Sequence, residues 1–429
     1  MINLTRLLCD VPQPADALRY GVGSGAPRSA ATRKPIVVWN ITRRCNLRCA
    51  HCYSSSTSRH YPGELTLPQF RATIDDLADF GVPGVLFSGG EPLIHPHFFD
   101  IAGYARERGL RLTLSTNGTL IDAEKAARLE ALGFAYVGIS LDGIGETHDQ
   151  FRGRTGAFDK TVAAFRHLRA VGQKSGLRLT LTRHTVTDLE RILDFIEAEE
   201  IRRVCFYHLV YSGRGADLSL LEPHETRAAL DTIMERVEVW HRAGHTREVL
   251  TVDQPADGAY LWMRQSERDP AAAARALELL RWNGGGNHSS GVGLANIDTQ
   301  GAVHPDQFWQ DHTLGNVKTE PFSRIWQRTD DALLNGLRST SRPLTGRCSD
   351  CRFRAICGGG FRVRAWQRHG DAWAEDPGCY LRTEEIAPAM LSWNRMNDGR
   401  DAGFGGHLDP GQDAARRAVL GGRSPGLLL

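Results

Sequence analysis

Short apolar runs alternate with amphipathic stretches through the first half of the chain. The runs are rich in β-branched residues and bounded by Gly, Asn, Asp or Ser, a pattern typical of strands buried in a parallel sheet. Between them, apolar residues recur at helical spacing. The pattern predicts strands at 36–39, 85–87, 110–114, 136–139, 177–181 and 204–210, and helices at 67–80, 122–132, 158–171 and 189–199.

Strands and helices that alternate in this way indicate βα units around one parallel sheet. Six units are fewer than the eight of a closed TIM barrel. We therefore expect an α/β fold, with a partial (β/α)6 TIM-like barrel followed by a small C-terminal α+β domain. A long helix at 223–241 and a hairpin around Thr299-Gln300-Gly301 lie between them. The expected parts are an N-terminal extension and linker (1–34), the barrel (35–215), a helical connecting region (216–290), the C-terminal domain (291–390) and a disordered tail (391–429).

Composition and charge are those of an ordinary globular protein. Of 429 residues, 41% are hydrophobic and 24% charged, enough for a sizeable core. Lys and Arg number 52 against 50 Asp and Glu, so no charge excess favours nucleic acid or an anionic membrane as a partner. The chain has no apolar run of about 18 residues, and residues 1–10 are too charged for the core of a signal peptide. We expect a cytoplasmic protein.

Seven of the nine cysteines fall in two tight groups. An odd total and a reducing compartment both argue against a disulfide framework, and grouped cysteines are then more often metal ligands or redox groups. Cys9 and Cys205 stand outside both groups and receive no function. Cys205, inside a predicted strand, fits a small buried hydrophobe.

The first group, Cys45-Asn-Leu-Arg-Cys49-Ala-His-Cys52, follows the first predicted strand. Three thiolates at this spacing can hold three irons of a cube-shaped iron–sulfur cluster and leave the fourth iron open to a substrate or cofactor. The carboxyl end of a strand puts this loop at the barrel mouth, where such barrels carry out their chemistry. A zinc site that includes His51 is the alternative.

Polar segments follow the next three strands at the same mouth. The second strand ends at Gly89, Gly90 and Glu91, where the glycines let a ligand approach the backbone and the carboxylate offers an acceptor for an ammonium group. The third and fourth strands end in STNG (115–118) and SLDG (140–143). Each segment alone is ordinary loop chemistry. Together around one cysteine loop, they predict a cofactor site.

This set of motifs resembles the radical S-adenosylmethionine (SAM) superfamily. In that family the open iron chelates the amino and carboxylate groups of SAM, and one electron from the reduced cluster cleaves a carbon–sulfur bond to yield a 5′-deoxyadenosyl radical. The resemblance implies Cys45, Cys49 and Cys52 as ligands of a [4Fe–4S] cluster. It also implies SAM contacts for Gly89, Gly90, Glu91, Ser115, Asn117 and Ser140.

The second group supplies four thiolates, enough to enclose a second cluster. Its members are Cys348, Cys351, Cys357 and Cys379. Structural zinc is the alternative. The spacing resembles the C-terminal SPASM or twitch domain of many radical SAM enzymes and implies an auxiliary [4Fe–4S] cluster. A full SPASM domain holds two, but this chain has no cysteine near His304 or at Phe361, where that domain would need them. We expect one auxiliary cluster.

Longer stretches resemble one branch of the superfamily, the NirJ family of haem d1 biosynthesis, over about residues 30–385. The narrower signals are GELT (63–66), YSGRG (211–215), VHPD (303–306) and EDPxCYL (375–381). The resemblance implies removal of propionate side chains from a siroheme-derived tetrapyrrole, didecarboxysiroheme. Departures at VDQP (252–255) and CGGG (357–360), where more Asn is expected, leave the exact substrate open.

Three alternatives stay open at this point. One is side-chain removal from another haem precursor, and one is a radical SAM peptide maturase. The short segment before the first strand argues against the maturase, because such enzymes often carry a longer N-terminal peptide-recognition domain. The third is a zinc-stabilised binding protein without enzymatic activity.

A tetrapyrrole with several carboxylates needs cationic donors around an apolar slot. We expect Arg152, His208 and Arg214, which follow the fourth and sixth strands, to contact these carboxylates. The expected partners are a small tetrapyrrole substrate and an electron donor such as flavodoxin or ferredoxin, with neither nucleic acid nor membrane.

Overall fold

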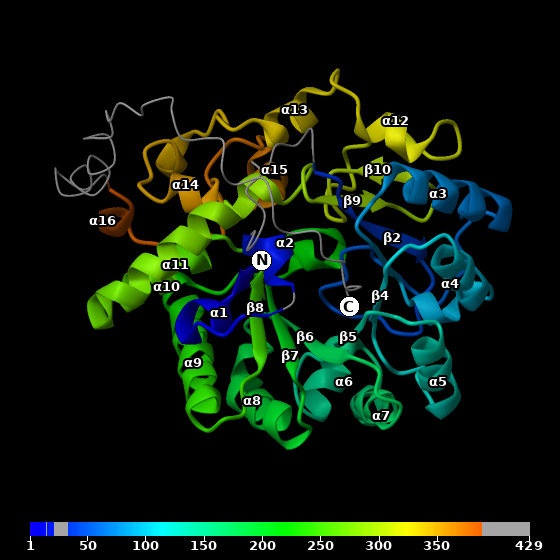
Figure 1. Cartoon of the computed structure of the whole chain (residues 1–429), viewed down its shortest axis with the longest axis horizontal. Helices are drawn as coiled ribbons and strands as arrows, with labels where there is room; N and C mark the ends of the chain where they lie inside the picture. Colours follow the sequence, from blue (N-terminus) through cyan, green and yellow to red (C-terminus); the bar gives the residue numbers. More distant parts are fainter. Residues whose placement is uncertain (14, 21–32, 388–429) are drawn as a thin grey trace, which may run out of the picture. The chain divides into compact units, whose positions relative to one another are not determined.

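A sheet of eleven strands runs through the computed structural model, which describes residues 1–13, 15–20 and 33–387 (Figure 1). Neighbouring strands follow the order β1-β8-β7-β6-β5-β4-β3-β2-β9-β10-β11. From β2 to β8 the strands are parallel and in chain order, as successive βα units require. These seven are β2 (Ile36–Thr42), β3 (Val85–Gly89), β4 (Leu112–Thr116), β5 (Tyr136–Ser140), β6 (Ser175–Leu181), β7 (Arg203–His208) and β8 (Glu248–Val252).

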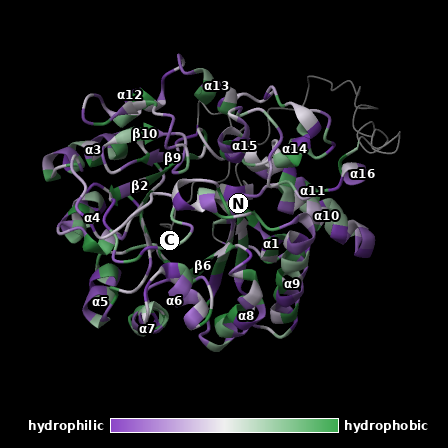
Figure 2. Cartoon of the chain, turned by 180° about the vertical axis from the view of Figure 1, so that it is seen from behind, coloured by the Kyte–Doolittle hydropathy of each residue, from purple (hydrophilic) through white to green (hydrophobic). Residues whose placement is uncertain are grey.

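Helices lie along the outer side of these strands and carry hydrophobic and hydrophilic positions side by side (Figures 1 and 2). A capping box between Thr66 and Gln69 begins the first of them, and Gly81, with φ of 78°, ends it. The five predicted helices are confirmed to within one residue at each end. The helices are α3 (Leu67–Phe80), α4 (Phe98–Glu107), α5 (Ala123–Ala131), α6 (Glu146–Arg152), α7 (Ala157–Ala170), α8 (Leu189–Ala198) and α9 (Pro223–Arg242).

Each strand presents one set of side chains to these helices and the other set to the opposite face, which we call the inner face. In β6, Leu177, Leu179 and Leu181 share the main core with residues of α8. Arg178 therefore points to the inner face. In β7 and β8, Cys205 and its apolar neighbours form a separate small cluster on that face. The inner face is thus mixed, polar in the middle and apolar at β8.

The six predicted strands are present, and β8 is a seventh that sequence reasoning placed in a helical connecting region (216–290). Its five residues lie between two long helices and form too short an apolar run to stand out. The edge of β8 is covered by β1 (Ile2–Asn3), which pairs with it in antiparallel fashion. Helices α1 (Leu4–Cys9) and α2 (Asp16–Tyr20) complete this N-terminal segment.

The predicted hairpin is confirmed and extends the sheet at its other end. β9 (Leu294–Ile297) pairs in parallel with β2, and β10 (Ala302–His304) and β11 (Gly315–Asn316) follow in antiparallel order. The remaining helices are α10 (Ala256–Arg268), α11 (Pro270–Asn283), α12 (Phe322–Trp326), α13 (Ala332–Arg338), α14 (Arg354–Cys357), α15 (Arg362–His369) and α16 (Thr383–Ile386). In the second cysteine group, Cys357 ends the short helix α14, Cys348 ends a 3-10 turn, and Cys351 and Cys379 lie outside helices.

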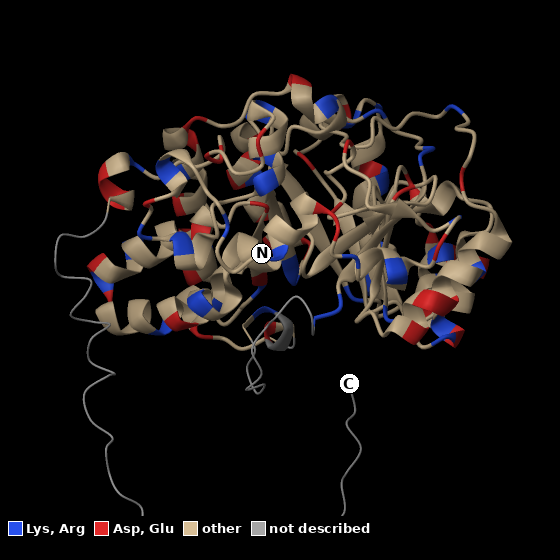
Figure 3. Ribbon diagram, turned by 90° about the horizontal axis from the view of Figure 1, so that it is seen from above, with Lys and Arg blue, Asp and Glu red and all other residues tan. Residues whose placement is uncertain are grey.

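Residues 1–387 form one compact unit, and the division into parts at 215 and 290 stays a prediction. The expected disordered tail (391–429) lies outside the described residues, as does most of the predicted linker. No helix among the described residues is long and apolar enough to cross a membrane. Basic and acidic residues are interspersed along the elements rather than gathered on one of them (Figure 3).

Candidate active site

The three cysteines of the first group lie together on the loop after β2. Cys45 and Cys49 are buried, Cys52 is partly buried, and all three are free thiols in one small packing cluster. Backbone amides donate to two of the sulfurs: Leu47 N lies 3.4 Å from Cys45 Sγ, and Ser56 N lies 3.4 Å from Cys52 Sγ. Such hydrogen bonds stabilise cluster-bound thiolates and tune their potential.

Two of these thiols, those of Cys45 and Cys49, need a nearby cation to ionise at neutral pH. Burial, assisted by the charge of Glu91, raises the pKa of Cys45 to about 12, and burial also raises the pKa of Cys49. A bound metal provides the positive charge that deprotonates such thiols. The donor set of this loop therefore fits an iron–sulfur cluster held by three cysteines.

A buried ion pair stands beside the loop. Arg152 Nη2 contacts Asp142 Oδ2, and Arg152 Nη1 lies 3.6 Å from Cys49 Sγ. Burial by itself would raise the pKa of Asp142, but the charge of Arg152, the hydrogen bond from the Thr180 amide and other neighbouring groups together hold the pKa below its ordinary value. Arg152, expected at a substrate carboxylate, is thus bound to a carboxylate of the chain and to a cluster cysteine.

His51, the zinc ligand of the alternative interpretation, packs against another ring instead. Its imidazole stacks on Phe151 with ring centroids 4.8 Å apart, and its Nε2 lies 3.7 Å from Asp142. Burial lowers the pKa of His51 to about 4, so the imidazole is neutral at pH 7. Among the described residues, no three His, Cys, Asp or Glu side chains converge around a single metal ion.

Arg214 holds the cysteine loop from the opposite side. Its Nε donates to the carbonyl of Cys49 (2.8 Å), and its Nη1 donates to that of Ser56 (3.0 Å). Gly213 comes so close that a Cβ there would lie 2.4 Å from the Cys52 carbonyl oxygen. The YSGRG segment therefore holds the cysteine loop in place. Arg214, like Arg152, forms its contacts with other residues of the chain.

Gly89 and Gly90 let the end of β3 pack against the cysteine loop. Gly89 has φ of 131°, and a Cβ there would lie 2.3 Å from the carbonyl oxygen of Thr42. A Cβ on Gly90 would lie 2.2 Å from the carbonyl oxygen of Arg44. Sequence reasoning explained these glycines by the approach of a ligand, and that stays a prediction. The structure adds that the backbone at Thr42 and Arg44 leaves no room for a Cβ at either position.

Glu91 is fully buried and joins β3 to the segment after β4. Its Oε1 accepts hydrogen bonds from the hydroxyl of Thr116 (2.8 Å) and the amide of Leu93 (3.1 Å), and its Oε2 accepts one from the amide of Asn117 (2.8 Å). Burial raises the pKa of Glu91 to about 7. Its predicted contact with an ammonium group stays a prediction, since three donors of the chain already reach the carboxylate.

The other predicted SAM contacts lie at the same edge of the sheet. Asn117 donates from Nδ2 to Asn46 Oδ1 (2.9 Å) and approaches Cys45 Sγ to 3.9 Å. Ser115, near the end of β4, accepts a hydrogen bond from Arg178 Nη1 (2.7 Å). Ser140, at the end of β5, is the register partner of Arg178. The fold thus brings Gly89, Gly90, Glu91 and Asn117 against the cysteine loop, while Ser115 and Ser140 adjoin Arg178.

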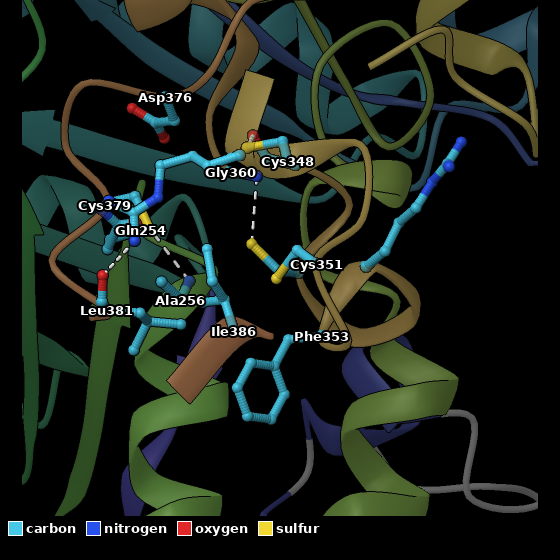
Figure 4. Close-up of a pocket in the computed structure, with 14 residues that line it drawn as sticks. Gln254, Ala256, Cys348, Cys351, Phe353, Gly360, Asp376, Cys379, Leu381 and Ile386 are labelled. Atoms are coloured by element: carbon cyan, nitrogen blue, oxygen red, sulfur yellow. Dashed lines mark hydrogen bonds between the residues drawn. The ribbon is translucent and has the colours of Figure 1, made fainter. Parts of the chain in front are cut away.

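All four cysteines of the second group line one pocket, which encloses about 410 Å³ of empty space, part of it open to solvent (Figure 4). Apolar side chains such as Phe353 and Ile386 form part of its wall. The amide of Gly360 donates to Cys357 Sγ (3.1 Å). Gln254, just after β8, also lines the pocket. Four free thiols facing one shared space fit a cluster enclosed by four cysteines.

A second buried ion pair fixes the loop that carries Cys379. Arg364 and Asp376 are both almost fully buried and share two hydrogen bonds of 2.8 and 2.9 Å. Burial by itself would raise the pKa of Asp376, but Arg364 keeps it below its ordinary value. The amides of Phe361 and Gly378 also donate to this carboxylate. The EDPGCYL segment therefore owes its shape to a fully paired aspartate.

Gly358, Gly359 and Gly360 all have positive φ, of 68°, 83° and 81°. Asn and Gly are the residues that most readily adopt this conformation, so the glycines and the Asn expected from the family resemblance suit the same backbone. At Gly360 a Cβ would lie 2.3 Å from Asp376 Oδ2. Glycine is therefore required beside the buried ion pair.

His208 belongs to a buried chain of hydrogen bonds rather than to an open surface. Its Nε2 lies 2.9 Å from Asp257 Oδ2, and the hydroxyl of Tyr380 donates to Asp257 Oδ1 (2.8 Å). Tyr380 directly follows Cys379. The network therefore ties the end of β7 to the second cysteine group.

The two positions at which a full SPASM domain would carry further cysteines are filled by packing residues. His304 is buried, and its Nδ1 lies 2.8 Å from the carbonyl oxygen of His312. Phe361 is buried next to Phe308, with ring centroids 5.8 Å apart. Neither position offers a sulfur ligand.

Two charged residues at this edge of the sheet were missed by sequence reasoning. Arg178 lies on the inner face of β6. Asp253, just after β8, has φ of 66°, and its Oδ2 is shielded without a hydrogen-bond partner. Burial raises the pKa of Asp253 to about 7. Asp253 was missed because β8 was not predicted. Without that strand, the sequence does not indicate that Asp253 lies at the mouth of the barrel.

A parallel barrel whose mouth carries a three-cysteine loop, with GGE and polar segments packed around it, defines a class of enzyme. A profile of the Radical SAM superfamily matches residues 39–196, from β2 into α8. The chain belongs to the radical SAM superfamily, whose members use SAM and a [4Fe–4S] cluster.

Individual relatives cover nearly the whole chain. The Fe-coproporphyrin III synthase of Methanosarcina barkeri is 47% identical over 400 residues, 90% of this chain and 99% of the relative. The pre-heme d1 synthase of Dinoroseobacter shibae is 45% identical over 374 residues, 85% of this chain and 90% of the relative. Among solved structures, SuiB of Streptococcus suis bound to S-adenosylmethionine has a TM-score of 0.64 at 18% identity, covering 81% of this chain and 78% of SuiB. That likeness shows the fold.

Proposed function

We propose that this radical SAM enzyme removes propionate side chains from didecarboxysiroheme, a siroheme-derived tetrapyrrole, in haem d1 biosynthesis. The observation that carries the proposal is the 45% identity to the pre-heme d1 synthase over 85% of the chain. A second candidate is side-chain removal that yields Fe-coproporphyrin III, favoured by the 47% identity to the synthase of that name. Both relatives favour a tetrapyrrole over the peptide alternative.

Cys45, Cys49 and Cys52 would hold the cluster that binds SAM. With SAM bound, that cluster supplies a 5′-deoxyadenosyl radical. The chain's own residues position it: Arg214 fixes the backbone of the cysteine loop, and Arg152 sets a positive charge beside Cys49. We assign Arg152 and Arg214 to this supporting role in place of the expected contacts with substrate carboxylates.

Cys348, Cys351, Cys357 and Cys379 would hold one auxiliary [4Fe–4S] cluster. Since four thiolates saturate such a cluster, we propose electron transfer or scaffolding for it rather than direct binding of substrate. The hydrogen-bond network from Tyr380 through Asp257 gives His208 a fixed orientation next to this site. We propose a cytoplasmic enzyme that takes electrons from a flavodoxin or ferredoxin.

The test is an anaerobic incubation of the reconstituted protein with SAM, a reductant and didecarboxysiroheme, followed by mass spectrometry. We expect stepwise loss of propionate-sized mass together with 5′-deoxyadenosine. A product with the mass of Fe-coproporphyrin III would select the second candidate. 5′-Deoxyadenosine with an unchanged tetrapyrrole would contradict both and turn the search to other porphyrins or to peptides.

A further inference from the structure

Arg178 occupies the middle of the inner face of the barrel. Its neighbours in β6, Leu177 and Leu179, are buried against the outer helices, so strand alternation turns Arg178 the other way. In the sheet register Arg178 stands between Ser140 of β5 and Cys205 of β7. The side chain is half-buried, which leaves it within reach of a bound molecule.

Two tyrosine rings flank the guanidinium. Its centre lies 6.0 Å from the ring centroid of Tyr136 and 5.9 Å from that of Tyr207. Among the described residues, the guanidinium makes one hydrogen bond, from Nη1 to Ser115 Oγ (2.7 Å). Nε is shielded from solvent and has no partner, and neither has the hydroxyl of Tyr136.

No carboxylate of the described residues forms an ion pair with Arg178. The buried Arg152 and Arg364 have carboxylate partners in Asp142 and Asp376, and the partly buried Arg203 on the same inner face lies 3.4 Å from Glu248. Two further buried arginines, Arg342 and Arg362, have no carboxylate partner in the described part of the chain but donate several hydrogen bonds to backbone carbonyls. In that same part of the chain, Arg178 has neither kind of partner beyond the hydroxyl of Ser115. The two tyrosines do not supply the missing charge, because burial raises the pKa of both phenols and keeps them neutral. A cation sheltered in this way is costly unless an anion joins it.

Space for the guanidinium is provided by a glycine in the next strand. A Cβ on Gly138 of β5 would lie 2.3 Å from Arg178 Nε and 2.8 Å from its Cζ. Any larger residue would push the guanidinium away from Ser115. The sheet is therefore built to hold a positive charge here, and the charge has no structural partner.

We propose that Arg178 binds a carboxylate of the tetrapyrrole substrate, with the hydroxyls of Ser115 and Tyr136 as neighbouring donors. This inference rests on the proposed function, since it names the group that anchors a propionate or acetate side chain inside the barrel. A guanidinium offers two parallel N–H groups that match a carboxylate. The other carboxylate source is the methionine part of SAM, but Arg152, 3.6 Å from Cys49 Sγ, is the cation next to the cluster loop.

The test compares Arg178→Gln with the wild type, both anaerobically reconstituted, in titrations with coproporphyrin III and, separately, with SAM. We expect coproporphyrin III to bind about 10- to 100-fold more weakly to Arg178→Gln, because charged hydrogen bonds are lost. SAM affinity should change less than about threefold. The tetramethyl ester of coproporphyrin III, which has no free carboxylate, should bind wild type and variant alike. Arg178→Lys should retain part of the affinity for the free acid.

Arg203→Gln is the matched control, because Arg203 lies on the same face and over the same Tyr136 ring, at 4.5 Å, but is paired with Glu248. It should bind coproporphyrin III like the wild type. Iron content and the unfolding temperature of each variant establish that it folds and carries its clusters.

Equal affinity of wild type and Arg178→Gln for coproporphyrin III would overturn the inference and leave the proposed function standing. Weakened SAM binding with unchanged porphyrin binding would overturn it as well and assign the carboxylate to SAM. A wild type that binds no coproporphyrin III would also overturn the inference, because the barrel would then not hold free tetrapyrrole carboxylates. The incubation with didecarboxysiroheme tests the proposed function separately.

Discussion

The two cysteine groups differ in what surrounds their sulfur atoms. Around the first, backbone amides and Arg152 point at the sulfurs, and polar segments from three strands crowd the loop. Around the second, four thiols face one pocket whose wall is partly apolar, and one backbone amide, that of Gly360, donates to Cys357 Sγ. The first group lacks a fourth thiol and is rich in polar neighbours, as a site that receives a polar cofactor requires. The second is complete in itself.

Each group has its own buried Arg–Asp pair, and the two pairs do different work. Arg152 contacts both Asp142 and Cys49 Sγ, so this pair belongs to the electrostatics of the first cysteine group. Arg364 is held by Asp376 in a two-point contact, and Asp376 also receives amides of the surrounding loop. That pair holds the backbone that carries Cys379. The same two residue types therefore place a positive charge beside the first cysteine group and fix the backbone of the second.

We expect the largest effect from removing one thiol of the first group. Cys49→Ala should lower 5′-deoxyadenosine formation by more than about 1,000-fold, because two remaining ligands cannot retain the cluster. Chromatography of anaerobic reactions measures the loss. Cys9→Ala, outside both groups, should stay within about twofold of the wild type. A Cys49→Ala protein that still cleaves SAM would show that this loop is not the SAM site.

Removing a thiol from the second group should separate the two functions. Cys357→Ala should lower tetrapyrrole turnover by more than about 100-fold while 5′-deoxyadenosine formation stays within about threefold, because the SAM site keeps all its ligands. Iron content should fall to about half. Since the variant could also unfold, Cys379→Ser provides a milder second test, checked by its unfolding temperature. Equal loss of both activities in folded variants would argue against separate roles.

The two ion pairs should also differ in their effect on stability and activity. The pair at the second group should contribute to the free energy of unfolding. Asp376→Asn should lower the free energy of unfolding by about 3–5 kcal/mol, because it leaves Arg364 buried without its charge partner. The pKa of Asp376 is depressed, so its contribution is complete above the ordinary aspartate pKa and is lost only as pH falls through the lower folded-state value. Urea unfolding should therefore give the same difference at pH 7 and pH 5. A difference that shrinks over that interval would contradict the assignment.

Asp142→Asn is the counterpart at the first site. It should reduce 5′-deoxyadenosine formation by about 10- to 100-fold, since Arg152 loses the partner that sets its position beside Cys49. Asp376→Asn should leave that reaction within about threefold in protein that remains folded at the assay temperature. If both variants lowered SAM cleavage alike, the two pairs would not differ in role.

Much of this architecture was predictable because its signals are local. The strands and helices follow from periodicity, and the cysteine groups follow from spacing within a few residues. The loop after β2 and the hairpin before the second group were predicted for that reason. β8 was not predicted because an apolar run of five residues between two long helices is too short to be recognised as a strand. For the same reason Asp253, which follows β8, was not recognised as a residue of the barrel mouth.

Partnerships between distant residues were not predictable. Arg214 reaches the carbonyl of Cys49 across 165 residues of sequence, and nothing near Arg214 indicates this. Arg152 looked available for a substrate until Asp142 was seen against it. Conversely, Arg178 became a candidate for binding a substrate only when the structure showed no carboxylate beside it among the described residues. Whether a charge is free or paired is a property of the tertiary structure.

The pairing of β1 with β8 has a consequence for how the chain folds as it leaves the ribosome. The hydroxyl of Thr5 donates to the carbonyl of Arg247, which is 242 residues further along the chain. At the other edge, Asn296 bonds back to the carbonyl of Val38, at a separation of 258 residues. The residues of β1 and β2 therefore emerge well before their partners on β8 and β9, and closing such long loops slows folding. The loop with Cys45, Cys49 and Cys52 is likewise synthesised before β8 and β9, so its thiols are made before the sheet that will shelter them is closed.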